Sequence, residues 1–128
     1  MNIEVFNQTT QGSINGTMKF PTVVQLLIEN GVEAYHVDLV RNEKTFYMPN
    51  GDSHKEKFNI PKFEIAKEFS SEKVKATIKE SQSSKITYVE FLELITQAGS
   101  NYYIVYLNGR KAIYFGRNGD LHIENFPQ

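Results

Sequence analysis

The stretch Gly99–Asp120, GSNYYIVYLNGRKAIYFGRNGD, decides the fold that we expect for this chain. Apolar and aromatic residues alternate along two of its segments, and each segment is followed by an Asn-Gly pair. Alternation with a period of two is typical of half-buried strands. Asn-Gly is a strong signal for a tight hairpin turn in which both central residues have positive φ. The stretch therefore predicts strand, turn, strand, turn.

Residues 31–52, GVEAYHVDLVRNEKTFYMPNGD, repeat this pattern earlier in the chain. The offset is 68 between Tyr35 and Tyr103 (103 − 35) and again 68 between His54 and His122 (122 − 54). We place compensating one-residue length differences in the turns between these points, because turns tolerate such changes. The repeat predicts an internal duplication.

Helical patterns precede both stretches at the same offset. Pro21 suits the first turn of a helix, since its missing N–H would be unpaired there. Thr87 followed by Glu90 forms a capping-box pattern at the start of the equivalent segment. The first segment is the weakest candidate, because its Thr, Gln and Gly residues have poor helix propensity. The four segments are residues 2–13, 20–30, 72–83 and 88–98.

We therefore predict an α+β fold built from internally duplicated helix-helix-meander halves. The pseudo-repeats span about residues 3–58 and 71–126, within a single domain of residues 1–128. A short ribbon of strands is marginal in water by itself. The two meanders are thus expected to form a mostly antiparallel sheet that the helices cover.

Composition narrows the class of protein. Of the 128 residues, 40% are hydrophobic and 23% charged, and the net charge is −1, so no overall field favours nucleic acid or a membrane surface. The chain has no cysteine, which excludes disulfides, thiolate metal sites and a cysteine nucleophile. No apolar segment has the length that crosses a bilayer. We expect a cytoplasmic protein without a cofactor or a bound metal.

Basic and aromatic residues near the C-terminus form the candidate binding site. Arg110, Tyr114 and Arg117 lie close together in the sequence. Such residues on strands suit single-stranded nucleic acid, but the order KAIYFG lacks the RNA-recognition strand motif, and we do not expect nucleic acid binding. The alternative is an anionic small molecule, held by these three residues with His54 or His122 as the acid–base group.

The histidines have no metal-ligand spacing. A pseudo-twofold axis relates His54 to His122, and the two would form a pair if both lay near this axis. Asp38 or Asp120 would then orient one ring for acid–base work. Such a pair would make the predicted anion-binding site an active site, with one histidine as its acid–base group.

The two halves differ on one strand face. His36 and Asp38 in the first half correspond to Ile104 and Tyr106 in the second, and Tyr102 lies beside them. A strand that is apolar on both faces is covered on both faces. The cover is either the chain's own linker between the halves or another subunit, and we interpret Tyr102, Ile104 and Tyr106 as a homodimer or partner surface.

The C-terminal third has a distinctive pattern, AG-x3-Y-x-V-x-L-x-GRK-x-IYFGRNGD-x-H-x-E-x-F, over Ala98–Phe126. With FPTVVQLLIENGV-x2-Y-x-VDL upstream, it resembles the YbcV-like family of small bacterial proteins of unknown function, some of which are labelled phage envelope protein. The N-terminal segment departs from the more regular first helix of that family. The resemblance implies no activity and no catalytic residues.

Two functions agree with these observations. No Gly-x-Ser-x-Gly, His-Glu-x-x-His or Walker pattern occurs, which favours a non-catalytic module that binds a protein or a small ligand. The alternative is an enzyme or binder that acts on an anionic small molecule at the Arg/Tyr/His site. The sequence leaves enzymatic activity open.

Overall fold

The computed structural model describes residues 1–127, and these form two helix-helix-three-strand units. The first unit contains α1 (Ile3–Asn15), α2 (Phe20–Glu29), β1 (Ala34–Asp38), β2 (Glu43–Tyr47) and β3 (Ser53–Lys57). The second contains α3 (Ser71–Gln82), α4 (Tyr88–Gln97), β4 (Ser100–Tyr106), β5 (Lys111–Gly116) and β6 (Leu121–Asn125). The predicted α+β class and order of elements are confirmed.

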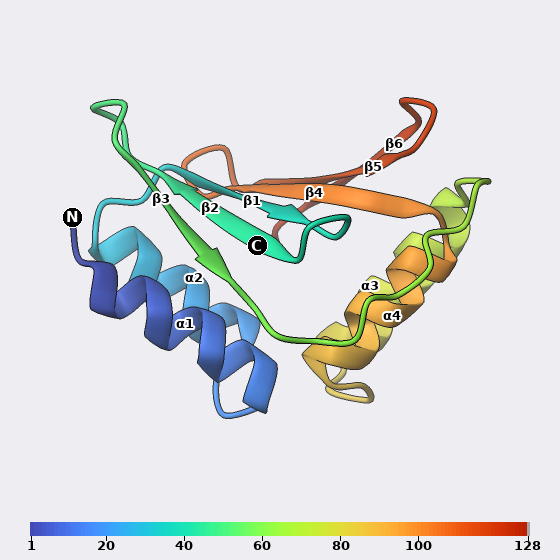
Figure 1. Cartoon of the computed structure of the whole chain (residues 1–128), viewed down its shortest axis with the longest axis horizontal. Helices are drawn as coiled ribbons and strands as arrows, with labels where there is room; N and C mark the ends of the chain where they lie inside the picture. Colours follow the sequence, from blue (N-terminus) through green and yellow to red (C-terminus); the bar gives the residue numbers. More distant parts are fainter. Residues whose placement is uncertain (128) are drawn as a thin grey trace.

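The six strands form one antiparallel sheet in the order β3-β2-β1-β4-β5-β6. The units join at its centre, where β1 pairs with β4 and Tyr35 lies opposite Val105. Both helix pairs lie on the same side of the sheet, α1 and α2 beneath the first unit and α3 and α4 beneath the second (Figure 1). Each unit thus contributes half of one two-layer structure.

The offset of 68 holds through the strand register. Phe46 pairs with His54, and their equivalents Tyr114 and His122 pair with each other (114 − 46 = 68 and 122 − 54 = 68). The expected one-residue length differences in the turns are therefore wrong. Each residue of the second unit corresponds to the residue 68 positions before it.

Left-handed backbone recurs at the same offset. Within residues 1–127, positive φ occurs at four equivalent pairs: Gly16 and Ser84, Gly31 and Gly99, Asn42 and Arg110, Gly51 and Gly119. The expectation that both Asn108 and Gly109 have positive φ is wrong, because four residues connect β4 to β5 rather than two, and the left-handed residue is Arg110.

The weakest helix prediction, α1, is confirmed, and tertiary contacts explain its stability. The side chain of Asn2 caps the helix by accepting a hydrogen bond from the Val5 N–H at 3.3 Å. Phe6 is fully buried and stacks on Phe46 of β2. Gly12 permits close packing, since a Cβ there would lie 2.9 Å from the Cβ of Met18. Packing therefore outweighs the poor helix propensity.

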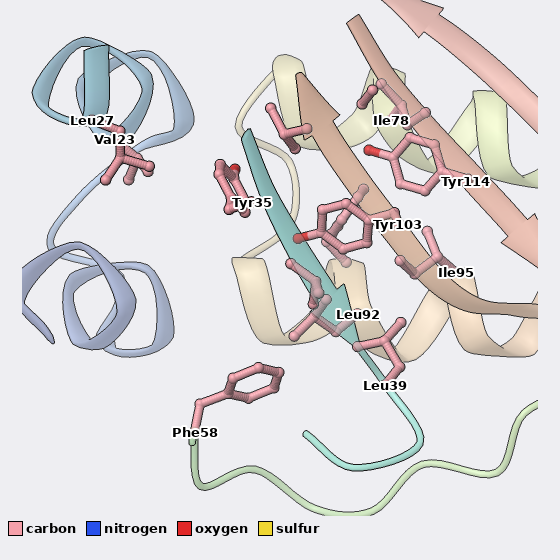
Figure 2. Packing of buried hydrophobic residues seen from close by; sticks show 14 of the residues in the cluster. Val23, Leu27, Tyr35, Leu39, Phe58, Ile78, Leu92, Ile95, Tyr103 and Tyr114 are labelled. Carbon is pink, nitrogen blue, oxygen red and sulfur yellow. The ribbon is translucent and has the colours of Figure 1, made fainter. Parts of the chain in front are cut away.

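The hydrophobic core lies between the sheet and the helices (Figure 2). The linker between the units stays on this helix side, where Phe63 and Phe69 pack against the core. A Cβ on Gly116 would lie 2.8 Å from the Cβ of Phe69, so this glycine gives the linker room. Among residues 1–127, none of the helices has the length and apolar character needed to cross a membrane.

Candidate functional site

The structure separates the two arginines of the predicted site. Arg110 lies in the turn before β5, with its guanidinium 5.6 Å from the centre of the Phe126 ring. Arg117 follows β5 and donates a hydrogen bond from Nη1 to the Ile65 carbonyl at 3.3 Å. The two residues are thus at opposite ends of a strand, roughly 20 Å apart at ~3.3 Å per residue. They do not share one anion.

The two histidines lie on opposite edges of the sheet, on β3 and β6, and five strand spacings separate them by roughly 24 Å. The expected pair at the pseudo-twofold axis is therefore wrong. Each ring instead pairs with the glutamate two residues later, His54 Nε2 with Glu56 and His122 Nε2 with Glu124 at 3.0 Å. Neither Asp38 nor Asp120 is the orienting carboxylate.

Tyr114 is the member of the predicted site that belongs to a larger polar group. Its ring stacks on Tyr103 with the centroids 5.0 Å apart, and the His122 ring lies 6.5 Å away on its other side. Tyr88, the first residue of α4, donates or accepts a 2.5 Å hydrogen bond between its hydroxyl and that of Tyr103. Figure 2 shows Tyr35, Tyr103 and Tyr114 projecting from β1, β4 and β5 on the same side of the sheet.

Lys44 of β2 completes this group and is only 3% exposed. Its Nζ lies 5.2 Å from the centre of the Tyr35 ring and 5.3 Å from that of Tyr88. A cation over aromatic faces gains about 0.5–2 kcal/mol, which offsets part of the cost of burying it. We call these five residues the tyrosine–lysine cluster: Tyr35, Lys44, Tyr88, Tyr103 and Tyr114.

The Lys44 amine has no counter-ion within residues 1–127. Glu56 lies opposite Lys44 on β3, but its carboxylate pairs with His54 and accepts a hydrogen bond from Asn7 Nδ2 at 3.1 Å. The preceding residue of β2, Glu43, shows the contrast. Its carboxylate on the other face of the sheet has two cations, Arg41 Nε at 3.0 Å and Lys55 Nζ at 3.5 Å.

Burial changes the proton equilibria of the cluster. It raises the pKa of Tyr88 to about 12, and it raises the pKa of Tyr35, Tyr103 and Tyr114 as well. It lowers the pKa of the Lys44 amine to about 8. At neutral pH the cluster therefore combines protonated hydroxyls with a positive charge. The Tyr88–Tyr103 bond is the only hydrogen bond within the cluster in the part of the chain described.

Sequence reasoning found Tyr114 but missed the rest of the cluster. The signal for Lys44 was present, because Lys44 and Phe46 lie two residues apart on a strand and so share a face. Its equivalent in the second unit is Ala112 (44 + 68), which shows that the fold itself needs no lysine there. Tyr88 gave no such signal, since its position depends on how α4 packs.

A hollow lies near Arg117, between the linker and the ends of β1 and β4. Its volume is about 470 Å³, and Lys62, Ile65 and Asn101 contribute to its wall. The Asn101 side-chain oxygen is buried without a hydrogen-bond partner among residues 1–127. Lys62 and Arg117 lie beside Glu64, so the charge of the wall is mixed. Among residues 1–127, no three His, Asp or Glu side chains lie close enough together to hold a metal ion.

The three residues predicted to form an interface lie on the face of the sheet that no helix of residues 1–127 covers. Register places further apolar side chains of β5 and β6 beside them. We call this set the apolar strip: Tyr102, Ile104, Tyr106, Ile113, Phe115, Leu121 and Ile123. The linker is excluded as its cover, because Phe63 and Phe69 pack on the helix side.

The fold and the buried cluster define a class: a duplicated α+β protein with one six-stranded sheet and a polar group beneath its centre. Residues 4–125 match the family described as a protein of unknown function, DUF1398, and the chain belongs to that family. No curated protein matches the chain.

Proposed function

We propose that this protein is a cytoplasmic, non-catalytic module that binds a small anionic ligand at the tyrosine–lysine cluster. The observation that supports the proposal is the Lys44 amine, which is buried among aromatic rings and lacks a carboxylate partner in residues 1–127. Burying an unpaired charge costs several kcal/mol. A bound anion offsets that cost. Part of the stability of the free protein is therefore given up for ligand binding.

The tyrosine hydroxyls supply the other half of an anion site. Their raised pKa values keep them protonated at neutral pH, so they donate hydrogen bonds to an oxyanion. A carboxylate or phosphate group fits this set of one ammonium and several O–H donors, because charge-assisted bonds to oxyanions are the strong ones. Tyr88 is half-buried and is the one member on a helix, and it is the most exposed residue of the cluster.

The site predicted from the sequence does not support the same function. Arg110 and Arg117 lie too far apart to bind one anion, and each histidine already pairs with a glutamate. The resemblance to the YbcV-like proteins names no ligand. Our proposal therefore has the same class of ligand as the alternative predicted from the sequence, an anionic small molecule. The residues that bind it are different.

The test is thermal unfolding with a panel of probes: acetate, succinate, inorganic phosphate and a sugar phosphate. At a concentration 100 times the dissociation constant, a ligand stabilises by about 2.7 kcal/mol, which raises Tm by several degrees. Lys44→Met removes the ammonium and keeps the length of the side chain. It should abolish the shift, whereas Lys55→Met, an exposed lysine on the neighbouring strand, should leave it intact.

Arg110→Ala separates this proposal from the sequence-based site and should leave the shift unchanged. An anion-dependent shift that survives in Lys44→Met and disappears in Arg110→Ala would overturn the proposal.

A further inference from the structure

The two edges of the sheet differ although the units are duplicates. On the uncovered face, the β3 edge carries Lys55 and Lys57. The equivalent of Lys55 on β6 is Ile123 (55 + 68), which is 49% exposed, and Leu121 beside it is 51% exposed. Lysines on an edge strand prevent another strand from pairing with it. The β3 edge has this protection and the β6 edge lacks it.

The free backbone groups of β6 can be assigned from its register. Gly116 N–H donates to the Asp120 carbonyl, and Phe126 N–H donates to the Arg110 carbonyl. Hydrogen-bonded positions alternate along an antiparallel strand, so the even-numbered residues of β6 face β5. The N–H and C=O groups of Leu121, Ile123 and Asn125 consequently point away from the sheet. Pro127, the next odd-numbered residue, has no N–H and ends this row.

A second copy of β6 complements this edge. Antiparallel pairing about a twofold axis at Ile123 places Ile123 opposite the partner's Ile123 and Leu121 opposite the partner's Asn125, so every outward backbone group meets another. The same register places His122 opposite the partner's Glu124, and Glu124 opposite the partner's His122. An imidazole N–H and a carboxylate oxygen are a donor and an acceptor, so these directly facing side chains suit hydrogen bonds across the strand pair.

The apolar strip continues into this edge. Ile104, Ile113 and Ile123 lie in one row across β4, β5 and β6. Strand pairing at Ile123 joins this row to the same row of the partner. Two half-exposed strips then become one apolar surface that spans the joint, where side chains of neighbouring strands shield each other from water.

We propose that the protein forms a twofold homodimer in which β6 pairs with β6 of a second copy, giving a continuous twelve-stranded sheet. The interface goes beyond ligand binding and does not depend on it, because the tyrosine–lysine cluster lies on the other face of the sheet. Ile104 lies two strands in from the joint, in the apolar row that the pairing extends.

The test combines sedimentation equilibrium of the full chain with amide hydrogen exchange at Ile123. The wild-type protein should be a dimer at submillimolar concentration, and the Ile123 N–H, which has no acceptor among residues 1–127, should exchange slowly in the dimer and quickly on dilution. Ile123→Lys, which installs the residue of the β3 edge, should raise the dissociation constant about tenfold or more. Thr45→Lys, in the same row on β2, is the matched control and should leave it unchanged.

A monomer at every concentration would overturn the proposal. So would a dimer in which the Ile123 amide exchanges at the rate of an exposed amide, whatever the behaviour of Ile123→Lys. Neither result bears on anion binding, which the Lys44→Met variant tests separately.

Discussion

At the scale of single residues, Lys44 is the side chain whose position the fold does not require. Its equivalent is Ala112, its burial is nearly complete, and its amine is without a counter-ion in the described chain. A charged group buried without a partner lowers stability, and proteins keep such a group where function needs it. The cost should therefore be measurable as a gain in stability when the charge is removed.

Lys44→Met should increase the free energy of unfolding by about 1–3 kcal/mol at pH 7, because the apolar chain keeps the packing and loses the desolvation cost. Urea denaturation measures this change. Lys57→Met, at an exposed lysine of β3 that has no ion pair in the described chain, should change the free energy of unfolding by less than about 0.5 kcal/mol, as is usual for surface sites. A loss of stability in Lys44→Met would show that the amine has a partner that stabilises the fold.

The same residue predicts a dependence of stability on pH. The pKa of Lys44 is about 8 in the folded protein and about 10.4 in an unfolded chain, so the unfolded state binds more protons between these values. The free energy of unfolding should therefore rise with pH, by at most about 1.4 kcal/mol per unit, from about pH 8 to 10. Above about pH 10 the raised pKa values of the cluster tyrosines act in the opposite direction.

Urea denaturation of wild type and Lys44→Met across this range gives the comparison. The variant should lack the rise between about pH 8 and 10. Parallel curves for the two proteins would contradict the assignment to Lys44.

At the scale of elements, equivalent helices of the two units differ in how they begin, so one serves as a control for the other. α4 has a capping box, in which Thr87 Oγ1 accepts from the Glu90 N–H at 3.1 Å and Glu90 Oε1 accepts from the Thr87 N–H at 2.8 Å. At the equivalent position of α2, Lys19 makes no side-chain cap. The helix that carries Tyr88 is thus fixed at its start, and α2 is not.

Thr87→Ala should lower the free energy of unfolding by about 1 kcal/mol, since it leaves helix N–H groups without an acceptor. Lys19→Ala should cost less than about 0.5 kcal/mol. Because Tyr88 follows the cap, Thr87→Ala should also weaken the anion-dependent rise in Tm, while Lys19→Ala should not. Equal losses in the two variants would mean that the capping box does not position the cluster.

At the scale of the whole molecule, the sequence predicts the architecture better than the site. Alternation, turn residues and an offset of 68 depend on neighbours along the chain, and they indicate both units and all ten elements. The site depends on neighbours across the sheet. The strand order brings Tyr103 and Tyr114 together with Lys44 beneath the centre, and it separates His54 from His122. No pattern within one segment contains that order.

The turns, too, are only partly predictable from the local sequence. The residues Asn108 and Gly109 correctly predict a turn, but its length and its left-handed residue depend on where β4 and β5 stop pairing. The unprotected β6 edge likewise depends on the strand register, which makes Ile123 the equivalent of Lys55.

The measurement that tests the central claim most directly is an NMR titration of the Lys44 amine, in free protein and with each anion of the panel. The free protein should give a pKa near 8, because burial without a counter-ion disfavours the charged form. A bound anion should raise this pKa toward or above about 10.4, since an opposite charge favours the ammonium. A pKa near about 10.4 in the free protein, unmoved by every anion, would contradict the proposed site.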